Sequence, residues 1–212
     1  MIVIQDIAPL QDRLTQAWHE PTVSGANQAP RDETVSSERL RREWLELVMQ
    51  QHLANFNLWH IEDEARTPGA SDAELAKVKR RIDVTNQQRN DLVEKLDLML
   101  LDWLRARSLP NPEAPLHSET PGLIIDRLSI LSLKIYHTRE EMDRKHAPPG
   151  HGYRNRERLA ILEKQRRDLA GCLDELWREI LSGRRRFELY RQMKMYNDPT
   201  LNPAVYGKSE TI

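Results

Sequence analysis

The residues best suited to chemistry lie between positions 83 and 97. Five polar side chains recur there at steps of three or four residues: Asp83, Asn86, Asn90, Glu94 and Asp97. Because an α-helix has about 3.6 residues per turn, a helix would place all five along one line. Four aliphatic residues recur beside that line and predict a buried face: Ile82, Val93, Leu96 and Leu100. Carboxylates at the edge of a buried face need a hydrogen bond, an ion pair or a metal ion.

Two neighbouring segments supply further polar groups. The segment before the line carries four of them on adjoining helical strips: Asn55, His60, Glu62 and Glu64. If this segment is a helix packed antiparallel against the next one, across the turn at residues 67–70, these groups would face the polar line. A later segment places three more on one broad side: Asp126, Lys134 and His137. Arg127 follows Asp126 in a turn where free backbone N–H groups are expected to favour an anion.

These groups predict a site for a phosphorylated small molecule and a Mg²⁺ ion. Mg²⁺ prefers oxygen ligands in proteins, so the predicted metal ligands are all carboxylates: Glu62, Asp83, Glu94 and Asp97. Three of these carboxylates are also the predicted catalytic residues: Glu62, Glu94 and Asp97. The remaining polar groups are the predicted ligand-binding residues: Asn55, His60, Asn86, Asn90, Asp126, Arg127, Lys134 and His137.

Such a site suits attack by a metal-bound water on a diphosphate, in a hydrolase or transferase acting on a nucleotide or sugar nucleotide. The string Glu94-Lys-Leu-Asp97 resembles the Glu-x-x-Asp half of the signature of the all-α nucleotide pyrophosphohydrolases. The Glu-x-x-Glu half that precedes it in that family is absent at the matching spacing.

The same pattern also has a structural interpretation. Asn and Asp side chains between helices can form a hydrogen-bonded polar layer that fixes the register of a bundle. His60 and His137 fit such a layer as well, because neither has a second histidine at metal-ligand spacing in the sequence. A further hypothesis is a non-enzymatic helical adaptor that binds a protein partner or a second copy of itself. Whether the chain is an enzyme is therefore left open by its sequence.

Hydrophobic periodicity predicts helices over about residues 5–19, 36–66, 72–107, from 121 onward and 155–196. Ser71 with Glu74 forms a capping-box pattern, and Thr120 before Pro121 is a strong helix start. In the last segment apolar residues alternate steps of three and four, which predicts a coiled-coil-like seam with a kink at Gly183.

We therefore predict an all-α protein, an antiparallel bundle of four to five long helices. The predicted organisation is a short N-terminal helix with a flexible linker over residues 1–35, a bundle domain over 36–196 and an irregular tail over 197–212. The long last helix is a candidate dimer contact.

Composition restricts the partners and the compartment. A net charge of -1 argues against a protein that coats nucleic acid or an anionic membrane. The single cysteine excludes an internal disulfide and a cysteine-rich zinc site. No segment approaches 18 consecutive apolar residues and no signal peptide is recognisable, so we predict a cytoplasmic protein without a membrane span.

Four strings resemble a known bacterial family of uncharacterised proteins, domain-of-unknown-function family number 4254. They are residues 57–66, residues 82–91, residues 118–131 with the strings Glu-Thr-Pro-Gly and Asp-Arg-Leu-Ser-Ile-Leu, and residues 196–203. The resemblance implies a bacterial cytoplasmic protein, often encoded near glycosyltransferases of surface-polysaccharide synthesis. A glycosyltransferase is therefore a candidate partner for the adaptor hypothesis. The family has no established activity from which catalytic residues can be transferred.

Overall fold

The computed structural model describes residues 4–20, 35–191 and 200–203, and within them the fold is all-α. The described helices are α1 (Ile7–His19), α2 (Val35–Glu64), α3 (Asp72–Arg105), α4 (Pro121–Met142) and α5 (His151–Leu181). The prediction of an all-α bundle is confirmed. The predicted linker and most of the predicted tail lie outside the described residues.

Local sequence signals set the helix starts. The Ser71 hydroxyl accepts a hydrogen bond from the Glu74 backbone N–H at 3.4 Å, and the Glu74 carboxylate accepts one from the Ser71 N–H at 2.8 Å, which completes the predicted capping box of α3. At α4 the Thr120 hydroxyl accepts from the Leu123 N–H at 3.2 Å, with Pro121 in the first turn.

The last helix ends earlier than predicted. Instead of running to residue 196, α5 stops at Leu181, and Gly183 adopts a φ of 71°, in the left-handed region that favours glycine. The chain then turns back, and the segment around Arg186 pairs with Leu116 in a short parallel bridge. Phe187 is buried there, although it belongs to the predicted helical seam. Its apolar character therefore reflects burial of a returning segment and not a longer helix.

The core lies where the five helices meet. Its fully buried side chains come from all of them: Ile7 of α1, Trp44 of α2, Leu96, Leu100 and Leu104 of α3, Ile124 and Leu128 of α4, and Leu173 and Ile180 of α5. Burying each such side chain contributes about 1.5–3 kcal/mol to folding. None of the described helices is long and apolar enough to cross a bilayer.

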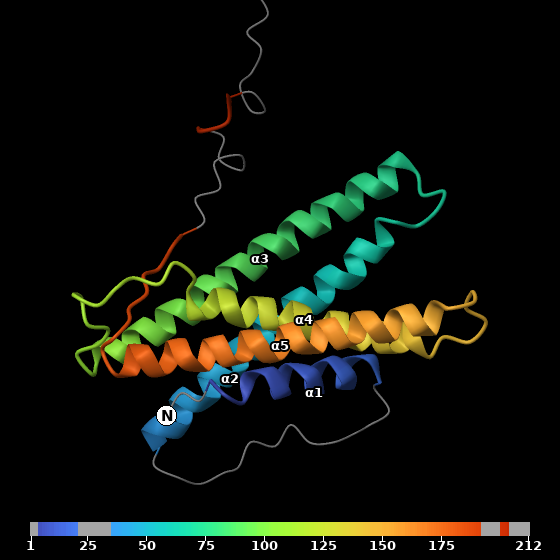
Figure 1. The fold of residues 1–212 in the computed structure, drawn as a ribbon. Coiled ribbons are helices and arrows are strands. Elements are labelled where there is room, and N and C mark those ends of the chain that lie inside the picture. The colour runs from blue at the N-terminus through green and yellow to red at the C-terminus, as the bar shows by residue number, and fades with distance from the viewer. Residues whose placement is uncertain (1–3, 21–34, 192–199, 204–212) are drawn as a thin grey trace, which may run out of the picture.

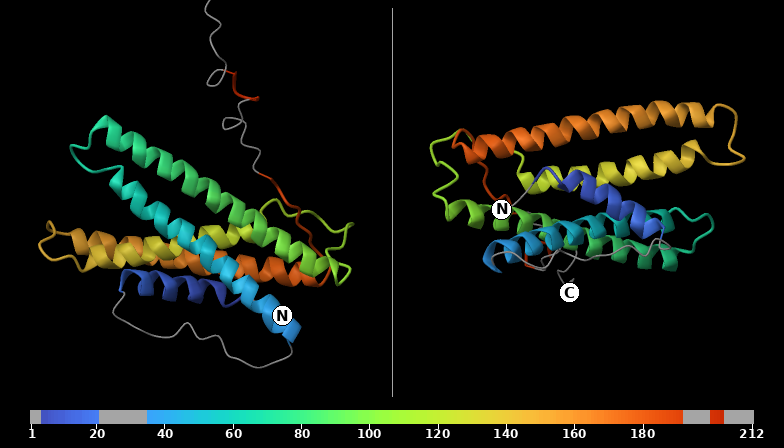
Figure 2. Two further views of the ribbon diagram at one scale, coloured as in Figure 1. Left: turned by 180° about the vertical axis from the view of Figure 1, so that it is seen from behind. Right: turned by 90° about the horizontal axis from the view of Figure 1, so that it is seen from below.

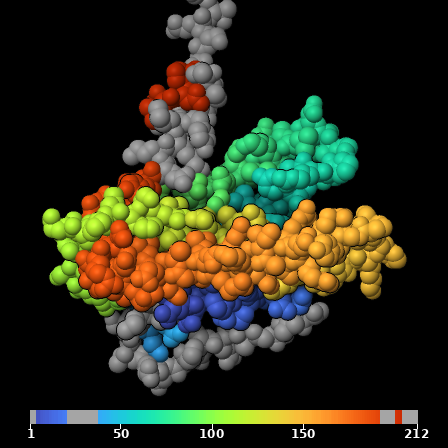
Figure 3. Space-filling model, viewed as in Figure 1, coloured from blue at the N-terminus to red at the C-terminus, as the bar shows by residue number. Residues whose placement is uncertain are grey.

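Two helical hairpins form the body of the molecule. The α2–α3 hairpin runs obliquely across the α4–α5 hairpin, and α1 lies along α4 and α2 (Figures 1 and 2). The far end of the α2–α3 hairpin projects beyond α4 and α5 as the teal tip in the space-filling view (Figure 3). The C-terminal end of α1 lies beside the last turns of α2 and the second half of α4, where polar side chains from three helices converge.

Candidate metal centre

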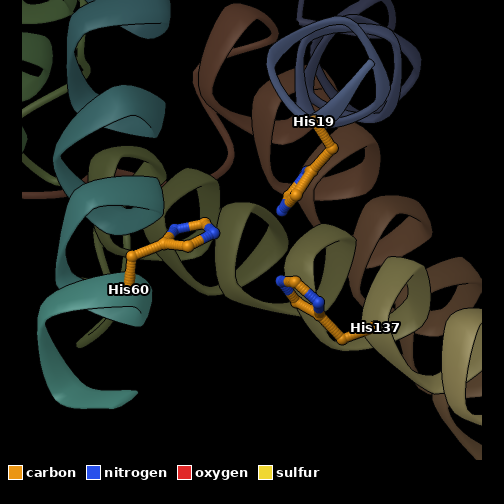
Figure 4. A group of neighbouring side chains, drawn as sticks. All are labelled: His19, His60 and His137. Carbon is orange, nitrogen blue, oxygen red and sulfur yellow. The ribbon is translucent and has the colours of Figure 1, made fainter. Parts of the chain in front are cut away.

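Three histidines from three helices point toward one another at this meeting place. His19 is the last residue of α1, His60 lies near the end of α2, and His137 lies in the second half of α4 (Figure 4). One ring nitrogen of each lies within 4.8 Å of a ring nitrogen of the other two. All three side chains are partly buried. Among the described residues, no other group of three or more His, Cys, Asp or Glu residues has this arrangement.

The Nδ1 atom of each histidine already has a hydrogen-bond partner. His19 Nδ1 donates to the Thr15 carbonyl oxygen at 2.7 Å, and His60 Nδ1 donates to the Phe56 carbonyl oxygen at 2.8 Å. His137 Nδ1 donates to the Glu140 carboxylate at 2.7 Å. Carbonyl and carboxylate oxygens only accept, so the proton of each neutral ring must sit on Nδ1. The Nε2 lone pair of each ring is therefore left for another ligand.

The Nε2 atoms lack hydrogen-bond partners within the described chain. Those of His19 and His137 are fully buried and unpaired. A buried polar atom without a partner costs about 1–3 kcal/mol, so such atoms call for an explanation. A metal ion bound to the nitrogens would supply one, because metal-bound histidines commonly donate their other ring N–H to a carbonyl or carboxylate.

Aromatic side chains hold the three rings in place. The Tyr136 ring stacks on His19 with centroids 4.2 Å apart, and the Trp59 ring stacks on His137 at 4.7 Å and 8°. Phe56 packs against His60 with centroids 4.4 Å apart. These contacts fix the ring planes and exclude water from two of the Nε2 atoms. Aromatic side chains therefore flank all three rings, and the Nε2 atoms of His19 and His137 are shielded from solvent.

Burial also favours the protonation state that binds metal. Burial lowers the pKa of the His137 imidazole below its usual value, the bond to Glu140 opposes this change, and the nearby His19 and His60 lower the pKa further. Metal ions bind the neutral form of histidine. Three imidazoles suit Zn²⁺ and neighbouring transition metals far better than Mg²⁺.

The arrangement matches a zinc centre with one open coordination position. A tetrahedral Zn²⁺ bound at about 2.0–2.1 Å by three imidazoles needs nitrogens roughly 3.4 Å apart. The three ring nitrogens lie within 4.8 Å of one another, so the rings would have to move closer together around a bound ion. Three protein ligands leave the fourth position for water or substrate, as in catalytic zinc sites.

The structure does not bring the four predicted magnesium ligands together. Glu62 forms an exposed ion pair with Arg66, and Asp83 forms one with Lys79. Asp97 is buried and accepts hydrogen bonds from the Thr120 hydroxyl and from the Gly122 N–H, the latter at 2.7 Å. Burial raises its pKa to about 6 against the effect of those bonds, and the neighbouring charge of Glu94 adds to the rise. Magnesium binding by these carboxylates stays a prediction.

Two predicted ligand-binding residues belong to a hydrogen-bonded layer instead. The buried Asp126 carboxylate accepts from Gln51 at 2.6 Å and from Asn55 at 2.9 Å, and both its oxygens accept from the Arg89 guanidinium. Asn55 also donates to Ser129 at 2.9 Å. This network joins α2, α3 and α4, as the polar-layer interpretation expects, and within it only the buried Gln51 Oε1 atom lacks a partner among the described residues.

The remaining predicted residues lie in other places. Asn86 lines a pocket between α2, α3 and α4, and Arg127 and Lys134 line a groove between α4 and α5. Asn90 is half-buried on α3 and lines neither hollow. Of the predicted set, the centre itself contains only His60 and His137.

His19 was missing from the predicted site, although the sequence carries a signal for it. An aromatic residue precedes each histidine of the centre: Trp18-His19, Trp59-His60 and Tyr136-His137. The other four histidines of the chain lack this neighbour. Two of these aromatic residues, Trp59 and Tyr136, stack on a histidine of the centre. The repeated dipeptide therefore marks histidines that share an aromatic frame.

A family model for proteins of unknown function, DUF4254, matches residues 45–189. The chain belongs to this family. The match covers His60 and His137 and begins after His19. No curated protein and no solved structure matches the chain. Membership of DUF4254 confirms the resemblance drawn from the sequence and brings no activity with it, so the function has to be argued from the site.

Proposed function

We propose that this DUF4254 protein binds one divalent transition-metal ion, Zn²⁺ by preference, through Nε2 of His19, His60 and His137. The observation that supports this proposal is that the three rings have the same hydrogen-bonding pattern. Each ring donates a hydrogen bond from Nδ1 to an oxygen atom of the chain and turns its unpaired Nε2 atom toward the other two rings. Hydrogen bonds of this kind orient histidines in zinc sites and raise their basicity.

The open fourth position supports a hydrolase. Zn²⁺ lowers the pKa of a bound water to about 7, which supplies hydroxide near neutral pH. We propose that the substrate of this water is a phosphate ester or anhydride of a small molecule. With the ion bound, this water would be the nucleophile of the hydrolysis: its oxygen would replace the leaving group on phosphorus, and its proton would pass to the leaving oxygen. The sequence prediction of a phosphorylated substrate is kept, and the metal and its ligands are changed.

Metal binding is tested first, with the full chain stripped by chelator. Calorimetric titration with ZnCl₂ is expected to give one equivalent, and Co²⁺ is expected to give the intense visible absorption of a tetrahedral centre. His60→Ala should weaken Zn²⁺ binding at least 100-fold, about 2.7 kcal/mol. His117→Ala is the matched control, because His117 Nδ1 also donates to a carbonyl oxygen, at 2.7 Å, outside the centre. Equal Zn²⁺ affinity in the His60 and His117 variants would refute the site.

Catalysis is tested separately, on zinc-loaded protein. Phosphate release from p-nitrophenyl phosphate, a nucleoside diphosphate and a sugar nucleotide should require Zn²⁺ and fall at least tenfold in His60→Ala. If the protein binds Zn²⁺ tightly and hydrolyses none of these compounds, the metal-site proposal stands and the hydrolase proposal is refuted.

A structural metal is the second candidate function, and one observation favours it. His19 ends α1, so a bound ion would fasten this helix to α2 and α4. Removing the metal would then expose the α1 contact. Limited proteolysis distinguishes the two roles: a structural ion should protect the chain from cleavage between α1 and α2, whereas a purely catalytic ion should leave the cleavage pattern unchanged.

The other sequence hypotheses remain separate proposals. Thermal unfolding with Mg²⁺ and a nucleotide panel tests the carboxylate site, and a shift that survives in His60→Ala would support it. The adaptor hypothesis, with a glycosyltransferase or a second copy as partner, calls for a pull-down that depends on α5 or the tail. The bacterial, cytoplasmic and polysaccharide-synthesis context belongs to the same proposal.

A further inference from the structure

A pocket of about 490 Å³ adjoins the metal centre between α2, α3 and α4. Trp59 links the two places, because it lines the pocket and its ring stacks on His137. The volume lies in the range of small-molecule sites, which run from about 300 to 1,000 Å³. No residue of the histidine cluster lines this pocket. The kind of ligand that the pocket binds is therefore inferred from the residues that line it.

The pocket offers no unpaired positive charge among its lining residues. Its two guanidinium groups are both neutralised: Arg66 pairs with Glu62 at 3.1 Å, and Arg89 is bound by both oxygens of Asp126. A strongly anionic ligand would have to compete with these carboxylates for the guanidinium groups. The walls therefore do not favour a phosphate or a diphosphate as the occupant.

Hydrogen-bonding capacity remains on the walls in both directions. The exposed Asp63 carboxylate, which only accepts, has no partner within the described chain. The Asn86 amide donor is also unpaired, and Arg89 Nη1 makes only a long contact of 3.5 Å with Asn86 Oδ1. Groups that donate and accept side by side match hydroxyls, because each hydroxyl does both.

The rest of the lining is apolar except for Asn55, whose amide already donates to Asp126 and Ser129. Beside the Trp59 indole the apolar part consists of four aliphatic side chains: Leu58, Ile82, Ile130 and Leu133. One face of the indole is covered by His137, so a flat aromatic ligand cannot be clamped between two rings here. A ring with an apolar C–H face and polar edges needs only one such wall.

From these walls we infer that the pocket binds the ring of a neutral sugar. Its hydroxyls bond to Asp63, Asn86 and Arg89, and its C–H face packs on the apolar lining. The inference goes beyond the metal centre and stands on the pocket alone. If both hold, the sugar of a phosphorylated substrate lies in the pocket and its phosphoryl group lies at the metal.

Binding is measured by following the Trp59 indole N–H signal by NMR, assigned through its loss in Trp59→Phe. Three probes represent sugars: the methyl glycosides of glucose, galactose and N-acetylglucosamine. Adenosine and inorganic phosphate represent the rival ligand classes. At least one glycoside is expected to shift the signal in a saturable way at millimolar concentration, with no saturable shift from phosphate or adenosine.

Paired variants locate the binding. Asn86→Ala and Asp63→Asn should each weaken glycoside binding about 5- to 10-fold, the effect of losing one hydrogen bond of this kind. Their controls, Asn90→Ala on the same helix and Asp83→Asn in an exposed ion pair, should change it less than about twofold.

Three results would overturn the inference: no shift from any glycoside, a saturable shift from phosphate or adenosine alone, or equal effects in the pocket and control variants. The metal proposal is judged independently, because His60→Ala should abolish zinc binding and leave glycoside binding intact.

Discussion

His52 and the three histidines of the candidate metal centre occupy the same bundle and use their ring nitrogens differently. His52 is fully buried, and both of its nitrogens have hydroxyl partners: Nδ1 lies 2.7 Å from Ser129 Oγ and Nε2 lies 2.9 Å from Thr15 Oγ1. His19, His60 and His137 are less buried, and each leaves Nε2 without a partner. His52 therefore belongs to a closed network, and the other three form an open one.

This difference teaches that burial alone does not mark a ligand site. A hydrogen-bonded layer of this kind holds helices in register, because both ring nitrogens of His52 and both oxygens of Asp126 already have partners. An open network keeps capacity that only a further partner can satisfy. Thr15 connects the two, since its hydroxyl bonds to His52 and its carbonyl oxygen fixes His19. The closed layer thus positions one ligand of the open centre.

The largest expected effect comes from breaking the closed layer. Asp126→Ala removes the acceptor of Gln51, Asn55 and Arg89 and should lower the free energy of unfolding by about 3–5 kcal/mol. The lower end is expected, because the Arg89 side chain is 25% exposed and water can solvate it. Urea unfolding measures the loss. Asp83→Ala, in an exposed pair, should cost less than about 1 kcal/mol, and similar losses in the two variants would contradict a structural role for the layer.

The second effect is a pH dependence that His52 should confer. Burial lowers the pKa of His52 to about 4. Between that pH and about 6.5 the His52 ring is therefore protonated in the unfolded chain and neutral in the folded chain. Stability is therefore complete above about pH 6.5 and falls as the pH drops toward 4, by up to roughly 3 kcal/mol at 1.4 kcal/mol per unit. Urea unfolding of wild type and His52→Gln at several pH values isolates this contribution.

Asp97 acts in the opposite direction over nearly the same range. Its raised pKa, about 6, gives stability that is present below about pH 4 and lost as the pH rises through 6. The wild type alone can therefore show a flat profile. The difference between wild type and His52→Gln cancels the Asp97 contribution, and a difference independent of pH would show that His52 is not held neutral.

Local signals were readable from the sequence, and long-range geometry was not. The caps at Ser71 and Thr120 were predicted correctly because each involves residues three apart in the chain. The end of α5 was missed, since Phe187 continues a helical period while being buried in a returning segment. Periodicity reports burial and cannot distinguish these two ways of achieving it.

The predicted polar line shows the same limit within one helix. Its residues do recur along α3, but α3 runs from the projecting tip of its hairpin to an end whose side chains are buried in the core (Figure 1). Asp83 is therefore exposed while Asp97 is buried. A common face does not mean a common environment. The metal centre needed in addition the docking of α1, which brings His19 to residues more than 40 positions away.

The third effect tests the open centre through stability. An ion that binds only the folded chain stabilises it by about 2.7 kcal/mol when its concentration is 100 times Kd. Zn²⁺ should therefore raise the free energy of unfolding of wild type by this amount and leave His19→Ala unchanged. Chemical unfolding with and without Zn²⁺ measures it. His52→Gln should keep most of the gain, and its complete loss there would mean that the two histidine sets form one unit.

The smallest effect concerns Glu140, which orients His137 without touching the metal. Its carboxylate accepts from His137 Nδ1 at 2.7 Å, so Glu140→Ala should free the ring to rotate and weaken Zn²⁺ binding about tenfold, or 1.4 kcal/mol, as such supporting partners do. Glu140→Gln keeps an acceptor and should recover part of the affinity. Glu141→Ala is the matched control, because Glu141 binds His151 and Arg144 instead. Calorimetry on the three variants decides the matter: equal affinities would mean that the His137 ring is held by Trp59 stacking alone.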